Sequence, residues 1–238
     1  MSLPCSLSIV VPAYNEAARI LSTLDAMQAH LDATGRTYEI LVVADGDDGT
    51  RERVTERQRD DERVRVSGSR ARRGKGRGVR LGVEQARGDV IGFVDADYKT
   101  PIEEMDKLLP WLDQGFDLVI GSRALVDSRI VVPQPRYRQI GSKVFAFGMH
   151  AIVGLRDVSD TQCGFKFFRA PVARDLFSRQ RIDGYMFDVE ILHLALRSGY
   201  RLKEVGVVWR DDNDSRLDLV AGNWRNLKDL LRIRFGAS

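Results

Sequence analysis

The sequence predicts a single α/β domain with a mostly parallel central sheet flanked by helices. Short apolar runs alternate with amphipathic helical patterns through the first half of the chain. Strands that alternate with helices in this order favour a parallel sheet with right-handed crossovers. The chain has 238 residues, of which 43% are hydrophobic and 30% are charged, as expected for one folded globular domain.

In the first half, each predicted strand is followed by a loop and then a helix. Residues 7–11 form an apolar run that ends at Pro12 and is typical of a buried strand. A helix is predicted to open at Asn15 and to end at Gly35, because apolar residues recur between them at helical spacing. The other elements expected here are strands at 38–43, 63–67 and 90–94, a polar helix that ends near residue 61, and a helix at 79–86.

The second half is less regular, but no linker or low-complexity tract marks a second domain. A helix is expected to start at Pro101, and a proline-containing loop at 126–135 leads into a helical stretch at 138–153. Residues 224–235 have the pattern of a basic amphipathic helix. The remaining predictions are strands at 117–120, 164–169 and 202–209 and helices at 171–177 and 186–197.

Charge and cysteine usage limit the classes of protein. The net charge of +3 is too small to indicate nucleic acid, which we do not expect as a partner. Cys5 and Cys163 lack the spacing of a metal site, so a reduced, cytoplasmic setting is expected. The apolar stretch at 144–155 is too short to span a bilayer, which leaves peripheral contact at the cytosolic membrane face as an option.

The basic residues between positions 63 and 80 are concentrated in an interval without acidic residues. Such a cluster suits phosphate groups on a ligand or a membrane, and it equally suits a solvated helix face with a loop. Its members are Arg63, Arg65, Arg70, Arg72, Arg73, Lys75, Arg77 and Arg80.

Asp95 and Asp97 directly follow the predicted strand at 90–94. In extended backbone, side chains two residues apart point the same way, so both carboxylates are expected to face one cation. Mg²⁺ and Mn²⁺ prefer oxygen ligands and keep positions free for substrate phosphates. Because this motif alone also fits a loop cap or a turn, its meaning depends on the rest of the sequence.

The chain contains several motifs in a fixed order: SIVVPAYNE at 8–16, VVADG at 42–46, GKG at 74–76, ARGD at 86–89, FVDAD at 93–97 and GSR at 121–123. Together these motifs resemble glycosyltransferase family 2. Two further segments, DTQCGFK at 160–166 and FDVEIL at 187–192, are similar to the dolichyl-phosphate glucosyltransferase branch, which is related to the dolichyl-phosphate mannosyltransferases.

This resemblance implies a GT-A fold over residues 1–238, with a Rossmann-like nucleotide-sugar-binding half at 1–98. The second half, 99–238, would bind the acceptor and end in the amphipathic helix. The resemblance assigns metal binding to Asp95 and Asp97, and Lys99 replaces a Gln that helps to hold the metal in the mannosyltransferases. It assigns donor binding to Pro12, Tyr14, Glu16, Asp45, Lys75, Asp95 and Arg216.

The acceptor residues implied by the resemblance are Arg123, Arg138 and Ser142. Arginine fits phosphate oxygens because its planar donors bind them in pairs. Asp188 matches the catalytic base of the family, and Asp97 is the second residue assigned to catalysis. Since a phosphate acceptor is largely ionised near neutral pH and needs no strong base, Asp188 is alternatively expected only to orient the acceptor or nearby cations.

The leading hypothesis is an inverting glycosyltransferase that uses Mg²⁺ or Mn²⁺ to transfer glucose from UDP-glucose to polyprenyl or dolichyl phosphate. GDP-mannose is an alternative donor, and a hydroxyl of a soluble metabolite or glycan is an alternative acceptor. A non-catalytic module that binds through its basic residues is the hypothesis from another class, and Asp95 and Asp97 argue against it. The sequence leaves the oligomeric state open.

Overall fold

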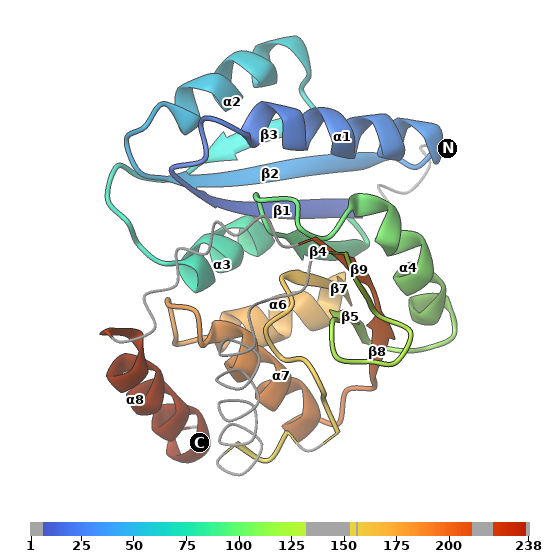
Figure 1. Ribbon diagram of the computed structural model, residues 1–238, viewed down its shortest axis with the longest axis vertical. Helices are drawn as coiled ribbons and strands as arrows, with labels where there is room; N and C mark the ends of the chain where they lie inside the picture. The colour runs from blue at the N-terminus through green and yellow to red at the C-terminus, as the bar shows by residue number, and fades with distance from the viewer. Residues whose placement is uncertain (1–6, 132–152, 156, 211–220, 237–238) are drawn as a thin grey trace.

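The computed structural model describes residues 7–131, 153–155, 157–210 and 221–236 (Figure 1). Its main sheet is seven-stranded, in the order β3-β2-β1-β4-β7-β5-β8. Only β7 runs antiparallel to its neighbours, so the prediction of a mostly parallel sheet is confirmed. The strands are β1 (Leu7–Tyr14), β2 (Tyr38–Asp45), β3 (Val64–Ser67), β4 (Val90–Val94), β5 (Leu118–Ser122), β7 (Phe165–Arg169) and β8 (Leu202–Gly206).

Helices cover both faces of this sheet (Figure 1). One face packs against α3 (Lys75–Gln85), α6 (Ala170–Ser178) and α7 (Phe187–Arg197), and α8 (Ala221–Phe235) packs on α7. The other face packs against α1 (Ile20–Ala33), α2 (Thr50–Asp60) and α4 (Met105–Asp113), which follows the short 3-10 helix η1 (Ile102–Glu104). The result is a three-layer α/β/α arrangement.

Strand β1 is buried on both sides because it lies inside the sheet. Leu7, Ile9 and Val11 belong to the core under α1 and α4, whereas Val10 belongs to the core under α3. Apolar side chains at successive positions therefore fill alternate faces, which explains why the sequence reads as a continuous apolar run.

Two predicted helix starts are wrong. Helix α1 begins at Ile20 rather than at Asn15, because Asn15 has a φ of 55° in the left-handed region. Helix α3 begins at Lys75 rather than at residue 79. Its first turn contains Gly76 and Gly78, whose low helix propensity hid the start, although both are buried against neighbouring elements.

The strand predicted at 202–209 divides into two. Strand β8 ends at Gly206, and β9 (Val208–Trp209) pairs instead with β6 (Arg129–Ile130) in a second, two-stranded sheet. Periodicity alone does not reveal that a strand changes its pairing partner. Strand β6 falls in the predicted loop at 126–135, and the predicted helix at 138–153 lies outside the described residues except for Val153.

The predicted C-terminal amphipathic helix is confirmed as α8. Leu230 and Ile233 are buried, whereas Leu231 and Phe235 are exposed. Across the described ranges, no helix combines the length and the apolar character needed to cross a bilayer.

Replacing Gly82 by alanine is expected to destabilise the fold. A Cβ atom at Gly82 would lie 2.3 Å from Cγ1 of Val10, so α3 would have to move away from β1. We expect the free energy of unfolding to fall by about 1–3 kcal/mol, even though alanine favours a helix by about 1 kcal/mol. Urea unfolding of Gly82→Ala measures this loss.

The matched control is Gly184→Ala, since an added Cβ meets no atom within 4 Å there. Its free energy of unfolding should stay within about 0.5 kcal/mol of the wild type. Equal stabilities of the two variants would contradict the close packing of α3 on β1.

Candidate active site

Several side chains predicted to be functional gather where the parallel strands end. Strands β1, β2, β4 and β5 carry Tyr14, Asp45, Asp95 and Arg123 at or directly after their last residues. Since these strands are parallel, their carboxyl ends lie at the same edge of the sheet, which is the usual place for a ligand site in this architecture.

Lys75 forms an ion pair with Asp95, the first carboxylate of the D-A-D motif at residues 95–97. Its Nζ lies 2.6 Å from Oδ1 of Asp95, and the lysine side chain is only 17% exposed. Burial would lower the pKa of Lys75, but the charges of Asp95 and Asp188 outweigh burial and raise it. Lys75 therefore remains protonated and supplies a fixed positive charge.

Asp97 is oriented by the residue that follows it by two positions. The backbone amide of Lys99 donates to Oδ1 of Asp97 at 3.3 Å, and the Lys99 ammonium lies 3.7 Å from Oδ2. Burial and the negative charge of Asp95 raise the pKa of Asp97. Tyr98, between the two, has a φ of 54°, a strained conformation of the kind that clusters at functional sites.

The pair of carboxylates suits a divalent cation. Asp95 and Asp97 offer hard oxygen donors, and burial together with the negative charge of Asp95 raises the pKa of Asp97, so a cation beside both carboxylates would stabilise their ionised forms. Across the described parts of the chain, no group of three His, Cys, Asp or Glu side chains is spaced to hold a metal. The residues present thus fit a cation that takes its other ligands from substrate and water.

Gly164 allows the loop before β7 to pass close to Asp95. The amide of Asp95 donates to the carbonyl of Gly164 at 3.1 Å. A Cβ atom at position 164 would lie 2.1 Å from Oδ2 of Asp95, so any larger residue would displace the carboxylate. This contact explains why the motif at 160–166 contains a glycine.

Arg123 is held in place by Asp160. Its Nε and one terminal nitrogen donate to the two carboxylate oxygens at 2.7 and 2.9 Å, and its backbone amide adds a third bond of 3.0 Å. Burial alone would raise the pKa of Asp160, but Arg123 outweighs it and lowers the pKa to about 2. Asp160 is itself positioned by Glu204, because the backbone amide of Asp160 donates a hydrogen bond to the Glu204 carboxylate at 2.8 Å.

Lys166 and Asp188 form a buried ion pair behind the sheet edge. Nζ of Lys166 lies 2.6 Å from Oδ1 of Asp188 and also donates to the carbonyl of Cys163 at 2.6 Å. The side chains are 1% and 3% exposed. Burial raises the pKa of Asp188 despite the opposing charges of Lys166 and Lys75, so this carboxylate depends on its partner to stay ionised.

The chain matches a known family model over most of its length. Residues 8–177 match the model described as glycosyl transferase family 2. The chain belongs to glycosyltransferase family 2. It is therefore a nucleotide-sugar-dependent glycosyltransferase, and the predicted family is confirmed.

Several similar proteins are dolichyl-phosphate beta-glucosyltransferases. The Drosophila melanogaster protein is 36% identical over 89% of this chain and 69% of its own length. The Dictyostelium discoideum protein is 34% identical over 96% of this chain and 74% of its own. The Homo sapiens protein is 31% identical, with the same coverage of 96% and 74%.

Solved structures bear out the GT-A fold. Mannosyl-3-phosphoglycerate synthase from Rubrobacter xylanophilus is 19% identical, with a TM-score of 0.72 and coverage of 96% of this chain and 73% of that one. Glucosyl-3-phosphoglycerate synthase from Mycobacterium tuberculosis, in complex with Mn²⁺, UDP and phosphoglyceric acid, is 22% identical with a TM-score of 0.68. It matches 96% of this chain and 78% of its own.

Four of the predicted donor residues, Pro12, Tyr14, Glu16 and Asp45, lie in or directly after β1 and β2. Asp45 accepts hydrogen bonds from the backbone amides of Ser69 and Arg73 at 3.2 and 2.8 Å, so it fixes the loop before α3. The guanidinium of Arg72 lies 4.5 Å from the ring centroid of Tyr14. Pro12 lies within β1, and the carboxylate of Glu16 pairs with Arg19 at 3.1 Å.

Three residues predicted for the site of this glycosyltransferase lie outside the described residues, namely Arg138, Ser142 and Arg216. Other residues at the site were not predicted. The ring centroid of Trp209 lies near two cations, 5.8 Å from Nζ of Lys99 and 5.5 Å from the guanidinium carbon of Arg123. Asp160 was not predicted as a site residue, although its position at the start of the DTQCGFK motif could have indicated it.

Four of the eight basic residues between positions 63 and 80 are held in ion pairs within the chain, one of them Lys75 with Asp95. Arg63 pairs with Asp61 and Asp32, Arg65 pairs with Glu39, and Arg80 pairs with Asp183. Because these arginines form intramolecular ion pairs, the structure favours the glycosyltransferase over a non-catalytic module that binds through its basic residues.

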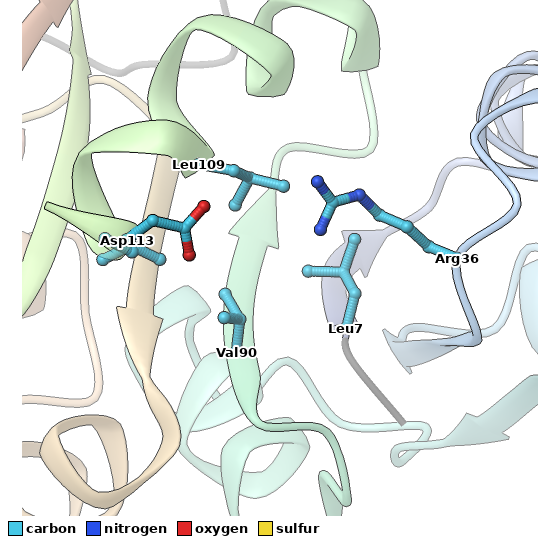
Figure 2. A pocket seen from close by; sticks show the side chains of 6 residues that line it. Leu7, Arg36, Val90, Leu109 and Asp113 are labelled. Carbon is cyan, nitrogen blue, oxygen red and sulfur yellow. The ribbon is translucent and has the colours of Figure 1, made fainter. Parts of the chain in front are cut away.

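A separate hollow lies at the other end of the strands. Figure 2 shows Leu7 and Val90, the first residues of β1 and β4, beside Leu109 and Asp113 of α4 and the side chain of Arg36. Because the D-A-D motif follows the last residue of β4, this hollow is not part of the candidate active site.

The Asp160–Arg123 pair predicts a specific loss of stability in acid. The pKa of Asp160 is about 2 in the folded protein against an ordinary value of 3.8, so the stabilisation by its ion pair is present above pH ~4 and is lost as the pH falls towards 2. The whole contribution is roughly 2 kcal/mol, of which roughly 1 kcal/mol is lost between pH 5 and pH 3.

Urea unfolding at both pH values tests this expectation. The wild type should lose roughly 1 kcal/mol more than Asp160→Asn between pH 5 and pH 3. Asp157→Asn, a change to an exposed acid of the same loop, serves as the control and should follow the wild type. If Asp160→Asn keeps the full pH dependence, the ion pair is not what holds Arg123.

Proposed function

We propose that this chain transfers glucose from UDP-glucose to a dolichyl or polyprenyl phosphate, with inversion at the anomeric carbon. Relatives that are 31–36% identical over most of the chain are dolichyl-phosphate beta-glucosyltransferases. Since the sugar of UDP-glucose is α-linked, a β-linked product requires inversion. A single displacement then joins the acceptor phosphate oxygen to the sugar as UDP departs.

One observation carries the proposal. Asp95, Asp97, Arg123 and the Lys166–Asp188 pair are gathered at the carboxyl edge of one sheet, in a chain of glycosyltransferase family 2. An acidic pair suited to a cation and an arginine suited to a phosphate are the groups that a nucleotide-sugar donor and a phosphate acceptor require.

The donor half of the site is proposed to lie within residues 1–98. Asp95 and Asp97 would hold Mg²⁺ or Mn²⁺, which stabilises the charge that develops on the departing diphosphate. Lys75 adds a second positive charge for the diphosphate, because its acidic neighbours keep it protonated despite its burial. Pro12, Tyr14, Glu16 and Asp45 would contact the nucleoside, and Arg216 would close over the diphosphate.

The acceptor half is proposed to lie within residues 99–238. Arg123 uses Nε and one terminal nitrogen on Asp160, and no bond from its other terminal nitrogen is found among the described residues. That nitrogen is therefore available to a phosphate oxygen, with Asp160 setting its direction. Arg138 and Ser142 are proposed to complete the phosphate site.

The surroundings of Asp188 favour a phosphate over a hydroxyl acceptor. A hydroxyl must lose a proton to a base within hydrogen-bonding reach. Asp188 is 3% exposed, and its Oδ1 accepts a hydrogen bond from the Lys166 ammonium, so little of this carboxylate is accessible to an acceptor hydroxyl. An ionised phosphate needs no such step, so we assign to Asp188 the positioning of nearby cations.

Peripheral contact with the cytosolic membrane face is proposed for α8. Leu231 and Phe235 are 45% and 77% exposed, and Arg232 and Arg234 are exposed on the same helix. A helix that presents apolar and basic side chains together suits the interface of an anionic membrane.

The transfer reaction can be measured directly. We expect purified protein with labelled UDP-glucose, Mn²⁺ and a short-chain polyprenyl phosphate to form a β-glucosyl phospholipid. Asp97→Asn should lower kcat/KM on the order of 10²-fold or more, because it weakens the charge stabilisation of the leaving diphosphate. Asp113→Asn, on α4 beside the hollow in Figure 2, should be fully active.

The same assay separates the alternatives. Transfer from GDP-mannose but not from UDP-glucose would replace the proposed donor, and transfer only to soluble hydroxyl acceptors would replace the proposed acceptor. The absence of product with every common nucleotide sugar would reject the proposal.

A further inference from the structure

Each carboxylate of the D-A-D motif already has a lysine beside it. Lys75 contacts Asp95 directly at 2.6 Å, whereas Lys99 lies 3.7 Å from Asp97, beyond a direct hydrogen bond. The two pairs together are formally neutral. A dication bound between these carboxylates would therefore add its charge next to two ammonium groups.

Lys99 is fixed in place more firmly than a surface lysine. Its side chain is 13% exposed, and its ammonium lies 5.8 Å from the ring centroid of Trp209. The amide of Arg210 donates to the carbonyl of Lys99 at 2.8 Å, which ties this backbone to the strand that carries Trp209. A second cation, the guanidinium of Arg123, lies 5.5 Å from the centroid of the same ring.

The position of Lys99 has an electrostatic consequence. The interaction of charges a few ångströms apart in a partly buried site is large enough to change an affinity on the order of tenfold or more. The Lys99 ammonium attracts Asp97 and repels any cation that Asp97 binds. A nucleotide diphosphate brings negative charge close to both the Lys99 ammonium and the bound cation, and so offsets the repulsion between them.

We propose that Lys99 sets the divalent-cation affinity of this site, making cation binding weak alone and strong only together with the nucleotide diphosphate. The inference rests on the proposed function, because it takes Asp95 and Asp97 as the cation ligands. It adds an order to binding: Lys99 links occupation of the cation site to arrival of the donor.

The test is a titration of the protein with Mn²⁺, in which electron paramagnetic resonance measures the free ion. Without nucleotide, Lys99→Gln and Lys99→Met should bind Mn²⁺ about tenfold more tightly than the wild type. The methionine variant is included because the glutamine amide could itself bind Mn²⁺, whereas Lys99→Met removes the charge without adding an oxygen ligand. Lys99→Arg, which keeps the charge, and Lys228→Gln, which removes an exposed charge on α8, should match the wild type.

Saturating UDP should tighten Mn²⁺ binding more in the wild type than in Lys99→Gln. The difference in Mn²⁺ affinity between the two proteins should therefore be smaller with UDP than without it. Unchanged or weaker Mn²⁺ binding by both Lys99→Gln and Lys99→Met, in variants with wild-type circular dichroism, would overturn the inference while leaving the proposed function intact. Absence of Mn²⁺ binding by the wild type with UDP, or binding that Asp97→Asn does not weaken, would overturn the proposed cation site itself.

Discussion

Buried and half-buried ion pairs hold the candidate active site together. Lys75–Asp95 joins α3 to the end of β4, Lys166–Asp188 joins β7 to α7, and Arg123 joins the end of β5 to the loop that carries Asp160. Removing charges from water is costly unless each finds a partner. Each pair therefore fixes the relative position of two elements as well as two side chains, and the site depends on all of them.

The antiparallel strand is what brings these pairs to one edge. Strand β7 runs between β4 and β5, with Phe165 opposite Val94. Because β7 is antiparallel, residues 160–164, which precede it, lie at the edge where the parallel strands end. Asp160 therefore contacts Arg123, and Gly164 contacts Asp95. A parallel strand in the same place would have delivered this loop to the far end of the sheet.

Local patterns in the sequence were sufficient for much of this architecture. Apolar runs identified the core strands, and the spacing of Asp95 and Asp97 after one of them predicted an acidic pair at the sheet edge. Three features escaped these patterns because they depend on tertiary contacts. The bond between Arg123 and Asp160 spans 37 residues, β9 leaves the main sheet at Val207, and the first turn of α3 contains glycines that propensity disfavours.

The central claim is that Asp95 and Asp97 form the centre of a donor site whose charges are balanced by neighbouring lysines and completed by a cation and a diphosphate. A crystal structure of the protein with UDP and Mn²⁺ tests this claim most directly. The account predicts Mn²⁺ bound by both carboxylates and by the diphosphate, with the Lys75 ammonium turned from Asp95 towards a phosphate oxygen. Mn²⁺ and UDP bound away from this sheet edge, or a D-A-D motif that contacts neither, would contradict it.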